Sequence, residues 1–156
     1  MLTKQNSESK TNNFLVQTNI PLHDKNWFAT GGPAKFFALP NSAQQFKEAL
    51  QFAHANFLPV FILGKGANIL ISDEGFNGLV IQPHNTHLQI LDDHLVKAGA
   101  DASMHDLIEF CLQHNLIGLE EFSGIPGTVG GSVYINLHYF QFLLEHFMVC
   151  ATVIHA

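Results

Sequence analysis

The stretch Gly124-Ile125-Pro126-Gly127-Thr128-Val129-Gly130-Gly131-Ser132 decides how the rest of this sequence is interpreted. Four glycines and a proline in nine residues are too many for a packed helix or the interior of a sheet. A structural turn needs only one or two glycines, so the stretch predicts a loop whose backbone a ligand approaches closely. We expect a short helix to start at Thr128, with exposed N–H groups that suit a phosphate or a flavin edge.

An earlier glycine-rich segment, Gly64-Lys65-Gly66-Ala67-Asn68, follows the apolar run 60–63, which predicts a buried strand. The Rossmann fingerprint is incomplete because Ile69 replaces its third glycine, and the Gly-Lys-Ser/Thr of a P-loop is absent. A plain tight turn remains an alternative, and Lys65 is expected to face solvent. Consecutive N–H groups in such a turn also form an anion-binding nest. Together the two segments predict loops that close on one extended, phosphate-bearing ligand.

Composition narrows the class of protein. Only 13% of the 156 residues are charged while 47% are hydrophobic, and about a quarter charged is typical of a soluble domain. The apolar excess predicts extra buried surface, in a ligand cleft or against another domain. A net charge of −6 without a basic stripe argues against a nucleic-acid partner. No apolar run is long enough to cross a membrane, the polar start lacks a signal core, and we expect a cytoplasmic protein.

Periodicity predicts an organisation of alternating strands and helices. Ser42 with Gln45, and Ser103 with Asp106, open helices that run to about residues 56 and 115. The expected buried stripes are Phe46, Ala49, Leu50 and Ala53 in the first helix, and Met104, Leu107, Ile108, Cys111 and Leu112 in the second. Strands are expected at 36–39, 60–63, 79–81, 87–91, 95–98 and 148–154, with a hairpin turn at Asp92-Asp93. We divide the chain into a flexible lead-in (1–20), a first lobe (21–85) and a second lobe (86–156).

The cysteines, the histidines and the pair Asp73-Glu74 are interpreted as structural or surface residues. Cys111 and Cys150 are expected to be buried, inert thiols without a disulfide. No pair of the ten histidines has ligand spacing beside a carboxylate or cysteine, so we expect no metal site. Asp73-Glu74 is interpreted as a pair of turn carboxylates that accept backbone N–H groups, with a general acid–base pair as the alternative.

Three blocks of the sequence resemble one known family. They are Trp27-Phe28-Ala29-Thr30-Gly31-Gly32-Pro33-Ala34, the segment 63–78 with Leu-Gly-Lys-Gly-Ala-Asn-Ile-Leu and Asp-Glu-Gly-Phe-Asn-Gly, and the segment 118–131 with Gly-Leu-Glu-Glu-Phe-Ser-Gly-Ile-Pro-Gly-Thr-Val-Gly-Gly. In this order and spacing they resemble the UDP-N-acetylenolpyruvoylglucosamine reductase (MurB) family over about residues 22–156. The family usually has serine where Ala67 stands.

The resemblance implies an α/β (α+β) fold, namely a two-lobed FAD-binding domain of the vanillyl-alcohol-oxidase/PCMH type with FAD between the lobes. By carry-over the pyrophosphate would lie on Gly64, Lys65, Gly66, Ala67, Asn68, Ile69 and Leu70. The flavin would lie on Ser123, Gly124, Ile125, Pro126, Gly127, Thr128, Gly130 and Gly131, with Asn136 nearby.

The resemblance also implies an activity, the NADPH-dependent reduction of UDP-N-acetylglucosamine enolpyruvate to UDP-N-acetylmuramate in peptidoglycan synthesis. The family's catalytic arginine, proton-donating serine and late glutamate fall beyond Ala156, so no catalytic residue is assigned. The chain is therefore expected to be the N-terminal FAD-binding half, inactive alone, with the UDP-sugar bound only together with the C-terminal half. Two alternatives stay open: a non-catalytic FAD-binding module or remnant, and another flavin oxidase of the same fold. The segment Gly64–Gly78 holds no histidine or cysteine, against a covalent-flavin oxidase.

Overall fold

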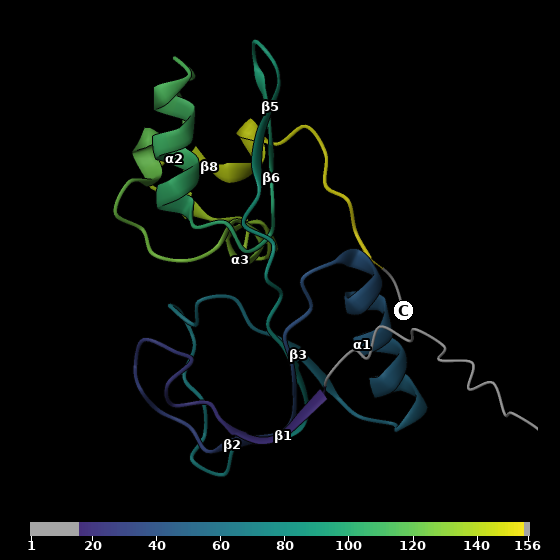
Figure 1. The fold of residues 1–156 in the computed structure, drawn as a ribbon. Coiled ribbons are helices and arrows are strands. Elements are labelled where there is room, and N and C mark those ends of the chain that lie inside the picture. The colour runs from purple at the N-terminus through teal and green to yellow at the C-terminus, as the bar shows by residue number, and fades with distance from the viewer. Residues whose placement is uncertain (1–15, 155–156) are drawn as a thin grey trace, which may run out of the picture.

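The structure, a computed structural model, describes residues 16–154 in two groups of elements that follow one another along the chain (Figure 1). The first group contains β1 (Val16–Pro21), β2 (Pro33–Ala38), α1 (Ala43–Ala55), β3 (Val60–Ile62) and β4 (Phe76–Ile81). The second contains β5 (Leu88–Asp92), β6 (Leu95–Ala98), α2 (Met104–Gln113), η1 (Glu120–Phe122), α3 (Val129–Tyr134), β7 (His138–Tyr139), β8 (Phe142–Leu143) and η2 (Leu144–Phe147).

The first group is a four-stranded sheet in the order β1-β2-β4-β3. β1 runs antiparallel to β2, while β2 and β3 both run parallel to β4. The predicted lead-in is therefore wrong for residues 16–20, which form most of β1; residues 1–15 lie outside the described part of the chain. The alternation of Val16, Thr18 and Ile20 is the signal for this strand that the sequence interpretation missed.

α1 covers one face of this sheet and begins where its capping residues predict. The Ser42 hydroxyl accepts a hydrogen bond from the N–H of Gln45 at 3.2 Å. The Gln45 side chain reaches back to the N–H of Asn41 at 2.9 Å, one residue earlier than in a standard capping box. The helix packs Ala49 and Ala53 against the central strand, as the apolar stripe predicts.

The other face of the sheet is covered by loops instead of a helix. Leu22 and Leu63 are fully buried there against Phe37 and Val80, and Ile69 and Ile71 pack onto the same cluster. The segment after β3 is therefore anchored to the core by side chains that alternate with exposed ones.

The prediction that residues 60–63 form a buried strand is only partly correct. β3 forms, but Val60, Phe61 and Ile62 are 38%, 37% and 48% exposed, and only Leu63 is buried. The reason is topological, since β3 lies at the edge of the sheet and β4 takes the central place. Sequence composition alone does not distinguish an edge strand from a central one.

The second group packs around α2, η1 and the β7–β8 hairpin. The Ser103 hydroxyl accepts from the N–H of Asp106 at 3.0 Å, which confirms the predicted helix start. The core contains Met104, Ile108, Phe122, Leu137 and Leu144. Leu112, expected in the buried stripe, is instead 44% exposed. The predicted hairpin forms, but its turn is Asp93-His94 instead of Asp92-Asp93, because Asp92 ends β5 and pairs with Leu95. The N–H of His94 donates to Asp92 Oδ1 at 2.8 Å.

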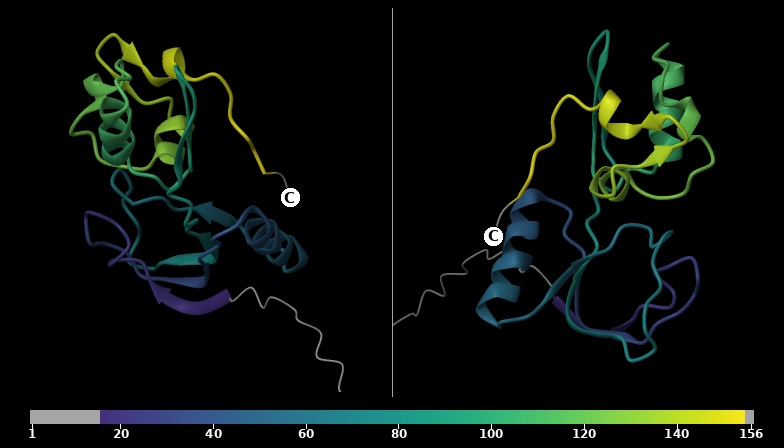
Figure 2. Two further views of the ribbon diagram at one scale, coloured as in Figure 1. Left: turned by 45° about the horizontal axis from the view of Figure 1, so that its top comes forward. Right: turned by 180° about the vertical axis from the view of Figure 1, so that it is seen from behind.

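The predicted final strand at 148–154 does not form. This segment has no regular structure, and Figures 1 and 2 show it leaving η2 and running toward α1. A strand needs a partner, and within residues 16–154 none pairs with it. Cys150 lies on this segment and is exposed, so the prediction of a buried thiol is wrong there, whereas Cys111 is buried. No helix among the described residues is long and apolar enough to span a membrane.

Candidate cofactor site

The two glycine-rich segments, far apart in sequence, meet in the structure. A Cβ atom built on Gly64 would lie 2.6 Å from the hydroxyl oxygen and 3.3 Å from the methyl carbon of Thr128. The loop after β3 therefore touches the residue that begins α3, with no room for a side chain between them. The contact brings the two predicted loops together, and their closing on one phosphate-bearing ligand stays a prediction.

The first segment offers a row of free backbone donors. Among the hydrogen bonds of residues 16–154, the N–H groups of Gly64 through Asn68 make none, although their chain is held firmly by other atoms. Gly66 is buried, has φ +64°, and is so close to Lys25 and Asn26 that a Cβ would lie 2.5 Å from the Lys25 carbonyl. A fixed loop with consecutive unpaired N–H groups is an anion-binding nest.

Two hydrogen bonds hold this first loop, and one of the residues that make them, Gln82, was missed from the sequence. The Gly64 carbonyl accepts from the Gln82 side chain at 2.9 Å, and the Gly66 carbonyl accepts from the Trp27 N–H at 3.1 Å. Gln82 follows β4, whose carboxyl end lies beside that of β3 because the strands are parallel. This adjacency of strand ends is the signal that could have found Gln82.

Asn26 is the second missed residue and organises the loop before β2. Its buried side-chain amide donates to the carbonyls of Leu22 and Thr30, both at 2.7 Å, and its oxygen accepts from the Phe28 N–H at 3.1 Å. These bonds fix the chain on either side of Trp27, which in turn bonds Gly66. Asn26 directly precedes the first block of the family resemblance, and a short polar side chain there predicts a local backbone bond.

The second segment uses its backbone differently from the prediction. The N–H groups of Val129 and Gly130 donate to the carbonyls of Ala102 and Ala100, both at 2.8 Å, and Gly131 donates to the Thr128 hydroxyl at 3.2 Å. The expectation of exposed N–H groups at the start of α3 is therefore wrong for Val129, Gly130 and Gly131. The start of α3 packs tightly against residues 100–102 of the same chain, so the carbonyl groups there accept these hydrogen bonds.

Two glycines of the second segment nevertheless keep its backbone open. Gly124 and Gly127 have φ +81° and +139°, and a Cβ on either would meet no atom within 4 Å. Their conformations favour glycine while the space beside them stays free. Within the described chain, the N–H groups of Gly127 and Thr128 also make no hydrogen bond. Ser123 and Pro126 lie exposed in the same loop, between η1 and α3.

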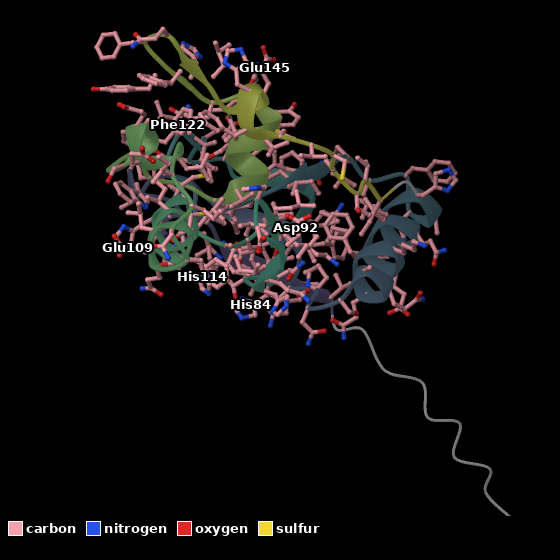
Figure 3. All side chains as sticks on the ribbon, turned by 90° about the horizontal axis from the view of Figure 1, so that it is seen from above. His84, Asp92, Glu109, His114, Phe122 and Glu145 are labelled. Atoms are coloured by element: carbon pink, nitrogen blue, oxygen red, sulfur yellow. The ribbon has the colours of Figure 1, made fainter. Side chains whose placement is uncertain are left out.

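The remaining carried-over residues divide between core and surface. Ile69 and Ile125 pack onto the cores of the first and second groups, while Leu70 is 76% exposed. Lys65 is exposed, as expected, Asn68 is exposed and Ala67 is half-buried. Both ends of the Asn136 side-chain amide are engaged by Glu145, labelled in Figure 3, with its Nδ2 donating to the carboxylate at 2.7 Å. The residues that the resemblance assigns to the cofactor lie on the two glycine-rich loops, except Asn136, which lies just beyond α3.

One half-buried carboxylate lies at the junction of the two groups. Burial raises the pKa of Asp101 above its ordinary value of 3.8, opposed by His84, whose Nδ1 lies 3.6 Å from the carboxylate, and by the positive charge of Lys65. His84 is on the surface (Figure 3). The charge of Lys65 is thus partly balanced by Asp101, which leaves the backbone N–H groups as the main donors of the first loop.

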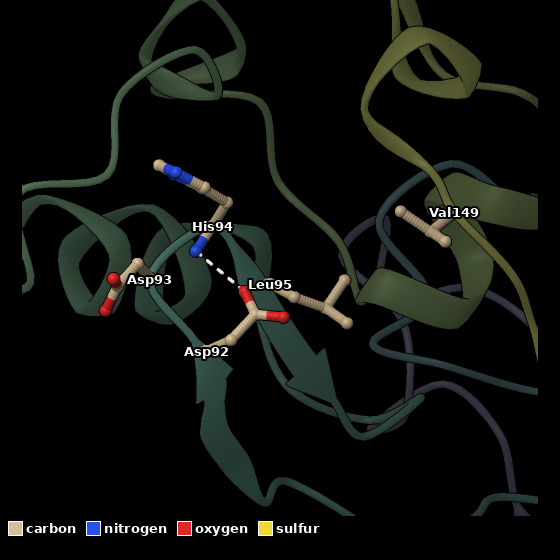
Figure 4. A pocket seen from close by; sticks show the side chains of 5 residues that line it. All are labelled: Asp92, Asp93, His94, Leu95 and Val149. Carbon is tan, nitrogen blue, oxygen red and sulfur yellow. Dashed lines mark hydrogen bonds between the residues drawn. The ribbon is translucent and has the colours of Figure 1, made fainter.

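The described residues form neither the predicted turn contacts of Asp73-Glu74 nor a metal site. The turn at Asp73-Glu74 is held by Ser72, whose hydroxyl accepts from the Glu74 N–H at 3.2 Å, so a hydroxyl takes the role expected of the carboxylates. Residues 16–154 contain no group of three histidine, cysteine, aspartate or glutamate side chains placed for a metal. A hollow of about 530 Å³ is lined by the tip of the β5–β6 hairpin and Val149 (Figure 4), and none of its lining residues belongs to a glycine loop.

Comparisons with known proteins agree with this geometry. A family model described as FAD binding domain matches residues 34–149. UDP-N-acetylenolpyruvoylglucosamine reductase of Treponema pallidum is 39% identical over 127 residues, and that of Listeria monocytogenes is 30% identical over 151 residues. The crystal structure of UDP-N-acetylenolpyruvylglucosamine reductase (MurB) from Thermus caldophilus superposes with a TM-score of 0.69 at 28% identity.

The alignments cover most of this chain but less than the whole of each relative. They span 78% of this chain and 36% of the Treponema protein, 96% and 50% for the Listeria protein, and 83% and 45% for the Thermus structure. The chain thus spans half or less of the length of the relatives it matches. The α/β (α+β) FAD-binding fold is confirmed, and FAD is the cofactor of this fold. The chain belongs to the FAD binding domain family and corresponds to the FAD-binding N-terminal portion of the UDP-N-acetylenolpyruvoylglucosamine reductases.

Proposed function

We propose that this chain holds FAD between its two glycine-rich loops as part of a UDP-N-acetylenolpyruvoylglucosamine reductase, which forms UDP-N-acetylmuramate for peptidoglycan with NADPH as the hydride donor. The observation that supports it best is the row of unpaired N–H groups at Gly64–Asn68, placed directly beside Thr128. We place the boundary between the two lobes at residues 85–86, with β1 in the first lobe, so that the junction of the loops is also the junction of the lobes.

The residues of the first loop fit a pyrophosphate. Its five free N–H groups, Gly64 to Asn68, are held by contacts on both sides, so little reorganisation is needed when an anion binds. Ala67 supplies an N–H but no hydroxyl, so one donor that the family usually has is absent. Lys65 adds positive charge at the surface of the loop.

The second loop fits a flat ring system. Gly124 and Gly127 leave open backbone beside them, so a planar group can approach the main chain more closely than any side chain would allow. Thr128 and Ser132 are buried, and the Thr128 hydroxyl already caps α3. This loop would orient the flavin and exclude water from one side of it, while Ser123, Ile125, Pro126, Gly130 and Gly131 shape the surface around it.

Bound FAD supplies the hydride-transfer chemistry, and the protein supplies binding, orientation and protons. Within this chain we assign binding and orientation only. The reductase reaction is assigned to the whole enzyme, and the chain of 156 residues is expected to hold FAD without turning over the UDP-sugar.

The first test is the visible absorption spectrum of the purified chain, with the flavin identified after denaturation. Released FAD at near-stoichiometric amount is expected. NADPH-dependent bleaching is then measured with and without the remaining portion of a relative's reductase added in trans. A colourless chain that also fails to bind added FAD would refute the proposal.

The second candidate is an FAD-binding module without reductase activity. It is favoured by the absence of any assigned acid or base among the described residues around the two loops, since Asp73 and Glu74 lie on a separate turn. Retained FAD with no bleaching under either condition would support this candidate, whereas bleaching restored by the added portion would support the reductase.

A further inference from the structure

We propose that Trp27 packs its indole against the adenine ring of bound FAD, at the end of the cofactor opposite to the flavin. This inference rests on the proposed placement of FAD on the two loops. It assigns a role to an exposed aromatic side chain that the reductase proposal does not use.

The direction of the cofactor follows from the two neighbours of the first loop. Gly64 lies against Thr128 of the second glycine loop, and Gly66 lies against Lys25 and Asn26. A dinucleotide whose pyrophosphate lies on the N–H groups between them has two ends. If one end lies on the second glycine loop, the other extends toward residues 24–27.

A hollow of suitable character lies at that other end. It measures about 330 Å³ and is lined by Asp24, Lys25, Asn26, Trp27, Lys65 and Gln82. This volume is at the lower end of the range for small-molecule sites, which suits one part of a larger ligand. An aromatic face with carboxylate, amide and ammonium groups around it matches a purine, which stacks by its face and hydrogen-bonds by its edge.

Trp27 is held in place by its backbone but not by its side chain. Its N–H donates to the Gly66 carbonyl at 3.1 Å, and Asn26 fixes the chain around it with two bonds of 2.7 Å. The side chain is nevertheless 66% exposed. A large apolar ring displayed on a rigid backbone, beside free N–H donors, is suited to bind a planar group at small entropic cost.

The test uses the fact that Trp27 is the single tryptophan of the chain. Flavin-free protein is titrated with ADP, which carries pyrophosphate and adenine but no flavin, while tryptophan fluorescence is recorded. Dissociation constants for FAD, ADP and FMN are also measured for Trp27→Ala, for Trp27→Phe and for the control Phe28→Ala, which removes the adjacent exposed ring.

ADP is expected to quench the tryptophan emission. Trp27→Ala is expected to weaken ADP and FAD binding by about tenfold, as for loss of one base–aromatic stack, and to leave FMN binding unchanged. Trp27→Phe should restore most of the affinity, and Phe28→Ala should match the wild type.

Unchanged tryptophan emission on ADP binding, or equal affinity of Trp27→Ala for FAD, would overturn the adenine assignment while the FAD proposal stands. An equal loss of FMN and ADP binding would also overturn it, because Trp27 would then act only by holding the Gly66 loop. Failure of the wild-type chain to bind FAD would overturn both proposals.

Discussion

Replacing Gly64 by alanine tests the junction of the two loops, because the structure leaves no room for one methyl group. The new Cβ would lie 2.6 Å from the Thr128 hydroxyl oxygen. To reach an ordinary contact of about 3.5 Å the loops must separate by close to 1 Å. The backbone at Gly64 itself is not in the left-handed region, so the effect is steric and comes from the partner loop alone.

The cost of such overpacking is about 1–3 kcal/mol in the free energy of unfolding. Because the loops must also separate at the pyrophosphate position, we expect FAD to bind about tenfold more weakly or worse. Thr128→Ala alone should cost about 1 kcal/mol, since it removes the hydroxyl that caps α3 through Gly131. In the double variant the nearest remaining Thr128 atom is Cβ at 3.5 Å, so the clash is gone.

The double-mutant cycle is measured by urea unfolding and by FAD titration of each variant. We expect Gly64→Ala with Thr128→Ala to be more stable than the sum of the two single changes by at least 1 kcal/mol (about the size of a contact coupling). Gly64→Ala with Thr128→Ser should show no such rescue, because serine keeps the oxygen that clashes. Additive effects within about 0.5 kcal/mol would show that the two loops do not touch in solution, and the placement of FAD between them would lose its basis.

Three further changes test other parts of the molecule. Ala67→Ser places a hydroxyl beside the proposed pyrophosphate, and one added hydrogen bond should tighten FAD binding about threefold in an equilibrium titration. Weaker binding would contradict the assignment of this loop to the pyrophosphate. Asp101→Asn should stabilise the chain more at pH 7 than at pH 3. The reason is that a carboxyl whose pKa is raised by burial stabilises the fold only while protonated, and loses this contribution as pH rises through the raised pKa. Thermal unfolding at both pH values would show the reverse order if the effect of His84 on the Asp101 pKa were larger than that of burial. Phe122→Ala should lower the free energy of unfolding in urea by about 3–5 kcal/mol, since this ring is fully buried in the second core, and a loss below 1 kcal/mol would mean that the core is not packed as described.

Features set by neighbouring residues were predictable from the sequence. The hydroxyls of Ser42 and Ser103 each cap the helix that follows, as their spacing to Gln45 and Asp106 predicts, and α3 begins directly after Thr128 as expected. The conformational demands of Gly66, Gly124 and Gly127, all with positive φ, were likewise implied by the density of glycine.

Features set by distant parts of the chain were not predictable. Val60–Ile62 has the composition of a buried strand, and only the order of strands in the sheet makes it an edge. Residues 148–154 have the composition of a strand without a partner among residues 16–154. The N–H groups of Val129 and Gly130 were expected to be free, and only the approach of residues 100–102 consumes them.

That last difference changes how the two glycine loops share the binding of FAD. The N–H groups of Val129 and Gly130, at the start of α3, donate to the carbonyls of Ala102 and Ala100. They cannot donate to an anion unless these hydrogen bonds break. The negative charge of the pyrophosphate is then left mainly to the N–H groups of Gly64–Asn68, which the protein holds in place through Gln82, Trp27 and Thr128. In the second loop Gly127 and Thr128 also keep N–H groups without a hydrogen bond among residues 16–154. Glycine in the first loop is needed because other chain segments press against it, and at Gly66 also because of its positive φ. Gly124 and Gly127 have positive φ and leave open space beside the backbone. We therefore expect substitutions in the first loop to act on the affinity for the phosphate part of the cofactor, and substitutions at Gly124 or Gly127 to act on the flavin end.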